Sequence, residues 1–253
     1  MKRGNRILTV LLVGFLLACN GENAPDCFQN TGSLIREEIS LPSFTKITVF
    51  ENVTLVIKQG LQQKVEIETG SLLRNEVSAT VVGDRLLLRD TNDCNYFRAY
   101  GTTKVFVTAP DLNEIRSSTG WPIESDGVLA YPELSLFSES FLDPEALTTD
   151  GSFDLELNNQ NLNVVVNGIA YFKLSGNTEN LNLIVAAGDS RVEAEQLIAQ
   201  SVTIDHRGSN DLLIQPLQSL KGVIRGTGNV LSYFRPAVVE VDILYIGRLE
   251  YKD

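Results

Sequence analysis

A repeat with a period of about 20 residues constrains the fold of this chain more than any other feature of its sequence. Short apolar segments recur at nearly constant intervals: Leu162–Val166, Leu181–Val185, Val202–Asp205 and Leu220–Ile224. A turn containing glycine follows each segment, and a second short alternating run follows the turn. An even period with two or three strands per repeat and no helical pattern is typical of a β-solenoid.

The alternation inside each segment predicts which side chains enter the core, because successive residues of a strand point to opposite faces. Leu181, Leu183 and Val185 share one face of their segment, and Asn182 falls on the other. Stacked coils would pair as parallel strands, and right-handed crossovers are the usual ones. We therefore expect an all-β, right-handed parallel β-helix. The equivalent inward positions of its coils are Leu162, Leu181, Val202 and Leu220.

The residues before the repeats alternate in the same way but at irregular intervals, with a hairpin-like turn at Val82–Asp84. Repeat arrays need atypical ends, because an open coil exposes its core and unpaired backbone groups. We expect an irregular N-terminal β cap at 32–111 and solenoid repeats at 112–253. The interval from Leu134 to Leu162 is clearly longer than those that follow it, which indicates an insertion in that coil.

Residues 1–18 have the features of an export signal. Three basic residues precede the apolar run Ile7–Leu17. That run is shorter than the roughly 20 residues that span a bilayer, so it fits a cleaved signal peptide at 1–18.

Leu16-Leu17-Ala18-Cys19 resembles a bacterial lipobox, which predicts lipid modification of Cys19. The alternative is an ordinary signal peptide that ends at a cysteine. With the lipid attached, residues 19–31 would form a tether, since they are rich in turn formers and have no periodicity. We expect an outer membrane lipoprotein of a bacterial cell envelope, either periplasmic or surface-exposed.

The charge of the chain limits its partners. It has 21 basic and 32 acidic residues, and loss of three basic residues with the signal peptide changes the net charge from −11 to −14. This excess of acid argues against nucleic acid, whose phosphates require clusters of Lys and Arg. It also argues against attraction to anionic lipid, so that the lipid anchor alone would hold the protein on the membrane.

Two further cysteines, Cys27 and Cys94, are expected to form a disulfide in an oxidising compartment. Closing the long loop between them would stabilise the fold by about 4 kcal/mol in the chain-entropy model. A metal or redox role would require a neighbouring cysteine or histidine, and the sequence has no C-x-x-C motif or Cys/His cluster.

Several stretches resemble one family of exported proteins common in Bacteroidetes. They are the lipobox, Asp26-Cys27, Asn92–Tyr96, Val107–Leu112 and the recurrent Gly-x-Gly-Asn turn. The family is named "putative auto-transporter adhesin, head GIN domain". The resemblance implies an all-β fold with a parallel β-helix, and it brings no catalytic residues with it.

No motif in the sequence indicates catalysis, a cofactor or a metal. The single histidine, His206, is expected to be a surface residue of a solenoid turn without a chemical role. Two pairs of acidic residues share a strand face, Asp154 with Glu156 and Glu193 with Glu195, and both fit a solvated outer surface. They also leave open a carbohydrate-active enzyme, because such sites gather carboxylates on one face.

Five aromatic residues lie near the junction of the cap and the repeats: Tyr96, Phe97, Tyr100, Trp121 and Tyr131. Exposed, they would form a platform that binds sugar or protein; buried, they would seal the cap onto the solenoid, which is the preferred interpretation.

The sequence as a whole favours a non-enzymatic envelope lipoprotein that acts as an adhesion- or scaffold-like binding module. Its expected partners are the membrane, through the lipid anchor, and a surface glycan or envelope protein. The alternative is a polysaccharide lyase or hydrolase built on the same β-helix.

Overall fold

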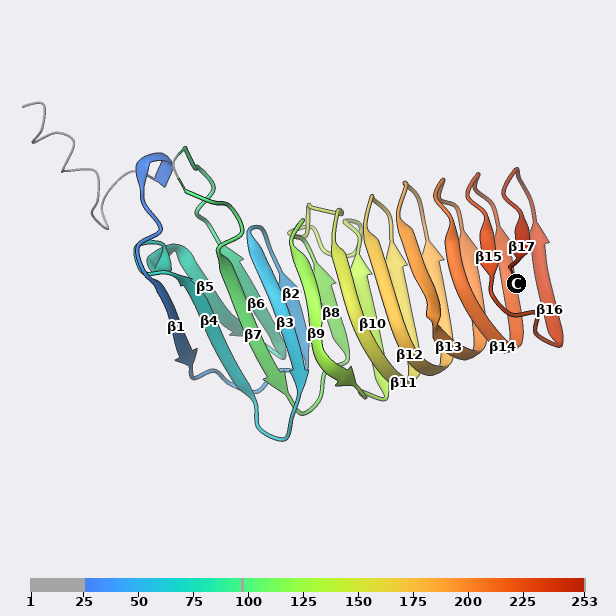
Figure 1. Cartoon of the computed structure of the whole chain (residues 1–253), viewed down its shortest axis with the longest axis horizontal. Helices are drawn as coiled ribbons and strands as arrows, with labels where there is room; N and C mark the ends of the chain where they lie inside the picture. The colour runs from blue at the N-terminus through green and yellow to red at the C-terminus, as the bar shows by residue number, and fades with distance from the viewer. Residues whose placement is uncertain (1–25, 97, 253) are drawn as a thin grey trace, which may run out of the picture.

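The computed structural model describes residues 26–96 and 98–252. This part of the chain contains 17 strands and two short 3-10 helices, Asp26–Phe28 and Arg74–Glu76. All the strands belong to one sheet, which wraps around a common core and is nearly closed (Figure 1). The predicted all-β class is confirmed.

The strands follow each other with short connections. The N-terminal ones are β1 (Leu34–Ile39), β2 (Lys46–Val49), β3 (Val53–Gln59), β4 (Lys64–Gly70), β5 (Val77–Val82), β6 (Arg85–Asp90) and β7 (Thr103–Ala109). The next are β8 (Glu114–Ser117), β9 (Pro122–Leu129), β10 (Glu133–Ser138), β11 (Ser152–Val166), β12 (Tyr171–Val185) and β13 (Arg191–His206). The last are β14 (Leu212–Ile224), β15 (Val230–Ser232), β16 (Val238–Ile243) and β17 (Leu249–Tyr251).

Consecutive coils stack in parallel and build two facing layers (Figure 1). The first layer contains β3, β9, the first halves of β11 to β14, β15 and β17. The second layer contains β2, β8, β10, the second halves of β11 to β14, and β16. The long strands β11 to β14 therefore pass from one layer to the other within a single coil.

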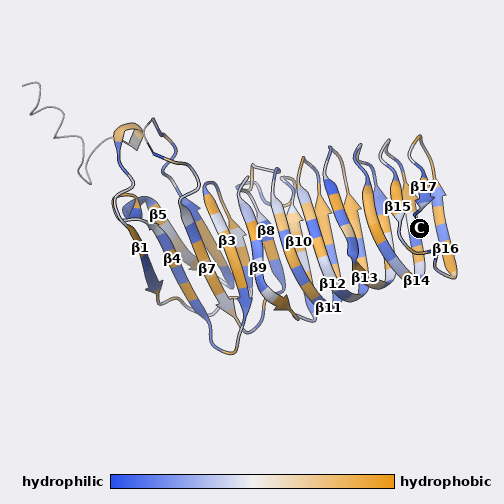
Figure 2. Cartoon of the chain, viewed as in Figure 1, coloured by the Kyte–Doolittle hydropathy of each residue, from blue (hydrophilic) through white to orange (hydrophobic). Residues whose placement is uncertain are grey.

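The predicted stacking of the repeat segments is confirmed residue by residue. Leu162 pairs with Leu181, Leu181 with Val202, and Val202 with Leu220. Each of these side chains is at most 1% exposed, whereas Asn182 next to Leu181 is half-buried on the outer face. The same alternation of apolar and polar residues is visible along the strands in Figure 2.

The N-terminal end of the stack is covered by antiparallel strands. In the first layer β7 pairs with β4 and β4 with β1, both antiparallel, and in the second layer β6 pairs antiparallel with β5. The parallel ladders nevertheless start before Leu112. The coil of β2 and β3 pairs with β6 and β7 on one side, and with β8 and β9 on the other. This early coil therefore lies inside the stack.

The turns after the second-layer strands stack as closely as the strands themselves. The backbone N–H of Asp189 donates to the carbonyl of Gly168 at 2.8 Å, and that of Ser209 donates to the carbonyl of Gly188 at 2.9 Å. A Cβ atom on Gly226, whose φ is ordinary, would lie 2.1 Å from the carbonyl oxygen of Gly208. Glycine is required there because the neighbouring backbone is too close for a side chain.

The expectation that His206 lies on the surface is wrong. Its side chain is fully buried at the end of β13, between Val185 and Ile224 of the adjacent coils. Among the described residues neither ring nitrogen has a hydrogen-bond partner of normal geometry. Burial lowers the pKa of His206, although the backbone of Asn210 and the nearby carboxylates act in the opposite direction.

Shortening one of the stacked inward side chains tests the register between the coils. Leu181→Ala removes buried methyl groups between two coils and should lower the free energy of unfolding by roughly 2–5 kcal/mol. Asn182→Ala is the matched control and should have little effect, because that side chain points outward. Urea denaturation of both variants measures the contrast, and a larger loss at Asn182 than at Leu181 would contradict the observed register.

The buried histidine predicts a pH dependence of stability. Because the folded-state pKa of His206 lies below the unfolded value of about 6.5, the unfolded chain takes up a proton that the folded chain excludes. Stability is fully present above pH 6.5 and is lost as the pH falls from there toward the folded-state pKa. His206→Leu should reduce this loss, since leucine suits a position stacked on Val185 and Ile224. Urea denaturation at pH 7.5 and pH 5.5, about one unit either side of the unfolded-state pKa, measures this loss in both proteins. The prediction fails if both proteins lose stability equally.

Candidate binding groove

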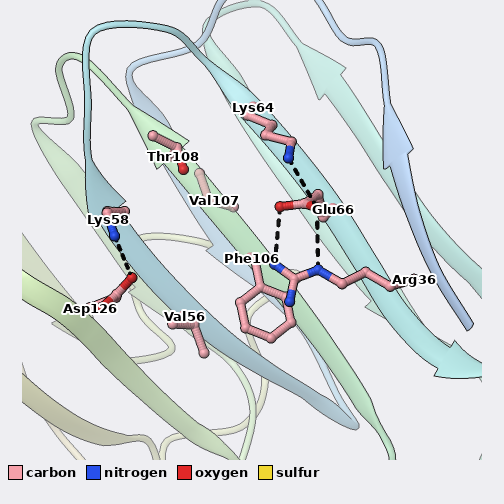
Figure 3. A pocket seen from close by; sticks show the side chains of 9 residues that line it. All are labelled: Arg36, Val56, Lys58, Lys64, Glu66, Phe106, Val107, Thr108 and Asp126. Carbon is pink, nitrogen blue, oxygen red and sulfur yellow. Dashed lines mark hydrogen bonds and ion pairs between the residues drawn. The ribbon is translucent and has the colours of Figure 1, made fainter. Parts of the chain in front are cut away.

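A shallow groove of about 250 Å³ lies on the outer side of the first layer, near the N-terminal end (Figure 3). Five strands, β1, β3, β4, β7 and β9, contribute its lining. The lining residues are Arg36, Val56, Lys58, Lys64, Glu66, Phe106, Val107, Thr108 and Asp126.

The groove is positioned by the alternation of its strands. In β4 the residues Val65 and Ile67 enter the core, so Lys64 and Glu66 face outward. Glu66 pairs across β7 with Phe106, and Lys64 with Thr108. Charged side chains from separate strands therefore meet on one outer face around a single aromatic ring.

Three cations and two carboxylates face each other in this groove. Arg36 donates to Glu66 through Nε at 3.2 Å and Nη2 at 3.0 Å, and Lys64 lies 3.1 Å from the same carboxylate. Lys58 pairs with Asp126 at 2.8 Å. The guanidinium of Arg36 also lies 3.7 Å above the centroid of the Phe106 ring, a cation–π contact.

The electrostatics of the groove argue against a general acid at Glu66. The hydrogen bond from Arg36, followed by that from Lys64, lowers the pKa of Glu66, so its carboxylate stays ionised at neutral pH. A general acid would need the opposite shift. Arg36, Lys58 and Lys64 retain 42% to 58% of their side-chain surface exposed, which leaves donors for an anionic or hydroxyl-rich ligand.

Two of the four acidic residues considered for an enzyme, Asp154 and Glu193, form ion pairs on the outer face of adjacent coils. Asp154, Lys173 and Glu193 follow each other in register, with Lys173 3.0 Å from Asp154. Arg191 lies 2.7 Å from Glu193, and the hydrogen bond from Tyr171 to Glu193 raises the pKa of Tyr171 to about 12. The hydrogen bonds from Tyr171 and Arg191 lower the pKa of Glu193, so this carboxylate too is held ionised.

The aromatic residues grouped by sequence differ in burial, so the expected sealing role fits Tyr131 and not Tyr96 or Tyr100. Tyr131 is fully buried, its hydroxyl donates to the carbonyl of Ala109 at 3.1 Å, and burial raises its pKa. Tyr96 and Tyr100 are 69% and 61% exposed. Trp121 is half-buried and lies against the backbone of Gly101. Phe97 is outside the described residues.

The predicted pairing of Cys27 with Cys94 is present in the structure as a disulfide. The backbone N–H of Tyr96 donates to the carbonyl of Cys27 at 3.1 Å, and the rings of Phe28 and Tyr96 are 5.7 Å apart. The N-terminal segment is thus fixed to the loop between β6 and β7. Cys19, the expected lipidation site, lies outside the described residues, as do the signal peptide and most of the tether.

Neither a membrane-spanning helix nor a metal-binding cluster occurs among the described residues. Between residues 26 and 252, Phe97 apart, no helix has the length and hydropathy needed to cross a membrane. The same part of the chain has no group of three or more His, Cys, Asp or Glu side chains arranged to hold a metal ion.

The groove was not predicted from the sequence. Its cations are single residues on different strands, and Arg36 comes together with Lys64 only through the antiparallel pairing of β1 with β4. The available local signal was the alternation of Lys64-Val-Glu-Ile-Glu68, which places an outward cation beside outward carboxylates. It does not indicate which other strands lie beside it.

Comparison with known proteins supports the same architecture. A putative adhesin of Bacteroides fragilis has a TM-score of 0.76 and 20% identity, covering 88% of this chain and 99% of its own. A putative adhesin of Parabacteroides merdae (TM-score 0.63, 18% identity) covers 88% of this chain and 98% of its own. A putative lipid binding protein of Parabacteroides distasonis (TM-score 0.63, 14% identity) covers 88% and 99%. At these identities the likeness concerns the fold.

Among curated proteins no match is found. The model of one protein family matches residues 43–236, which is most of the chain. This chain therefore belongs to the family described as "Putative auto-transporter adhesin, head GIN domain".

Proposed function

We propose that this protein is a non-enzymatic lipoprotein of the bacterial cell envelope that acts as an adhesion- or scaffold-like binding module. Family membership and the adhesin names of its structural neighbours support this function. Two of the four carboxylates considered for catalysis, Asp154 and Glu193, are held in ion pairs, as on a solvated surface. A carbohydrate-active enzyme on the same scaffold is the alternative.

The proposed anchor is an acyl group on Cys19 in the outer membrane, with the folded part either periplasmic or on the cell surface. The basic and apolar segments before Leu16–Cys19 support this location. The Cys27–Cys94 disulfide fits an oxidising compartment outside the cytoplasm.

We propose right-handed winding for the coils, which makes the array a right-handed parallel β-helix. The parallel ladders through β11, β12, β13 and β14 support a helical path, because each residue pairs with its equivalent one repeat later in the chain. Parallel crossover connections are right-handed in nearly all known cases.

The proposed ligand is a glycan that carries carboxylate or sulfate groups, bound in the groove around Arg36. A single observation carries this proposal: the Arg36 guanidinium is stacked on Phe106 and remains exposed, with Lys64 and Lys58 beside it. A pre-positioned guanidinium offers paired donors to an anion, and an aromatic ring suits the apolar face of a sugar. An envelope protein with an acidic segment is the second candidate for the same groove.

A glycan array probed with the mature chain tests this ligand. Arg36→Gln should weaken binding of acidic glycans by about tenfold, the loss of one charge-assisted hydrogen bond. Lys221→Gln is the matched control, because Lys221 is also half-exposed and ion-paired but lies in the second layer. Equal binding by all three proteins would contradict the groove assignment. Release of shortened oligosaccharides from the array would favour the enzyme.

Metabolic labelling tests the anchor. Cells fed a palmitate analogue should incorporate it into the full-length protein and not into the Cys19→Ala variant, because the lipobox cysteine is the proposed acceptor. Both proteins should be compared at equal abundance by immunoprecipitation. The same incorporation in the variant as in the parent protein would refute acylation at Cys19.

A further inference from the structure

The turns that follow the second-layer strands all lie along one edge of the molecule. These strands run parallel, so their carboxyl ends meet at one edge, the upper one in Figure 1. The loop after β6 belongs to the same edge because β6 is parallel to β2. We call this the turn edge.

Exposed apolar side chains occur at both ends and in the middle of the turn edge. Near the N-terminus they are Phe28, Tyr96 and Tyr100; in the middle, Phe141, Leu142, Leu147 and Ile169; near the C-terminus, Leu244, Tyr245 and Ile246. Each of them is at least 47% exposed. Three separate groups of exposed apolar side chains along one edge can all contact a flat partner at once, whereas a compact partner would reach only one of them.

The backbone of Phe141 and Leu142, two members of the middle group, is held by a buried ion pair. Glu139 is fully buried and accepts hydrogen bonds from the backbone N–H groups of Phe141 at 2.8 Å and Leu142 at 2.9 Å. Its other oxygen pairs with Arg116, which is 5% exposed. A buried charge pair is costly unless it is fully bonded, so this loop has a defined backbone. The exposed positions of its apolar side chains are therefore a feature of the ordered loop backbone.

The insertion noted in the sequence gives this loop its length. The interval between Leu134 and Leu162 is longer than the intervals in the following coils, and the extra residues lie between β10 and β11. Ala146 is fully buried and anchors the loop to the body, while Leu147 next to it is 75% exposed. Burial alternates with exposure inside the insertion itself.

The chain also reaches the folded part at the turn edge. The Cys27–Cys94 disulfide fixes the first described residues to the loop after β6. Cys19 lies only a short stretch of chain before Asp26, and this stretch extends over roughly 25 Å at most. An acyl group on Cys19 would thus keep a bilayer within reach of this edge.

We propose that the turn edge lies flat on a phospholipid surface, with its three apolar groups inserted among the headgroups. The proposal rests on the lipid anchor proposed above. Tyrosine, phenylalanine and leucine are the residues that bind at this depth. The net charge of −14 after loss of the signal peptide means that insertion of apolar side chains, and not attraction to anionic lipid, stabilises the contact. The first layer, with the groove, then faces sideways and stays accessible.

Fluorescent labels placed on the two edges test this orientation. The mature chain carries a histidine tag in place of the acyl group and is held on phosphatidylcholine vesicles that contain a nickel-chelating lipid. Leu147→Cys and Ile246→Cys report on the turn edge, and Leu61→Cys and Val82→Cys on the opposite edge, where both residues are exposed. The tag also replaces Cys19, and Cys27 and Cys94 are bonded, so the new thiol is labelled selectively.

Quenching by spin-labelled lipid should be strong at both turn-edge positions and absent at both opposite ones. Absence of quenching at Leu147→Cys and Ile246→Cys would overturn the proposal, because the molecule would then stand upright on its tether. Equal quenching at all four positions would also overturn it. The artificial tether makes this outcome independent of acylation in the cell, which palmitate labelling tests separately.

A triple substitution provides the matched energetic test. Phe141→Ser/Leu142→Ser/Leu147→Ser should weaken binding of the untethered chain to neutral vesicles at least about tenfold, since each apolar side chain contributes to insertion. Leu61→Ser/Val82→Ser/Phe234→Ser removes exposed apolar surface from the opposite edge and should leave binding unchanged. The same loss in both variants would contradict a preferred edge. Binding that requires anionic lipid would contradict the neutral-lipid mechanism.

Discussion

The parallel register between consecutive coils is the constraint on which the rest of this structure depends. Each strand presents its apolar residues to the core only if it pairs at the correct position, because a shift by one residue would turn every inward side chain outward. The column through Leu162, Leu181, Val202 and Leu220 meets this condition in four consecutive coils. Register also aligns the turns, where Gly226 approaches the carbonyl of Gly208 too closely for any side chain.

The same register stacks charged residues on the outer faces of the coils. Asp154, Lys173 and Glu193 alternate in sign along adjacent coils, and such exposed pairs contribute little stability individually. The pair of Arg116 and Glu139 differs because both side chains are buried. This buried pair holds the backbone of the long insertion in place. The exposed pairs lie on a surface whose shape is determined by the strands.

Much of the repeat array could be predicted from the sequence, because period-two alternation and a constant interval are both local. The register that correctly places Val202 and Ile204 inward also places His206 inward, and the surface expectation failed because it treated that residue as part of a solvated turn. The groove around Arg36 and the position of β2 and β3 depend on pairings between distant segments. Such pairings leave no local signal, so neither feature could be predicted.

The place of β2 and β3 inside the stack has a consequence for the order in which the protein folds. This coil precedes both of its neighbours in the chain, yet β6 with β7 and β8 with β9 occupy its opposite sides. We therefore expect growth to proceed outward from this coil in two directions. One direction ends at the antiparallel strands β4, β1 and β5, and the other continues coil by coil. Because the pairings of β2 and β3 are non-local, we expect their formation to be the slow step of folding.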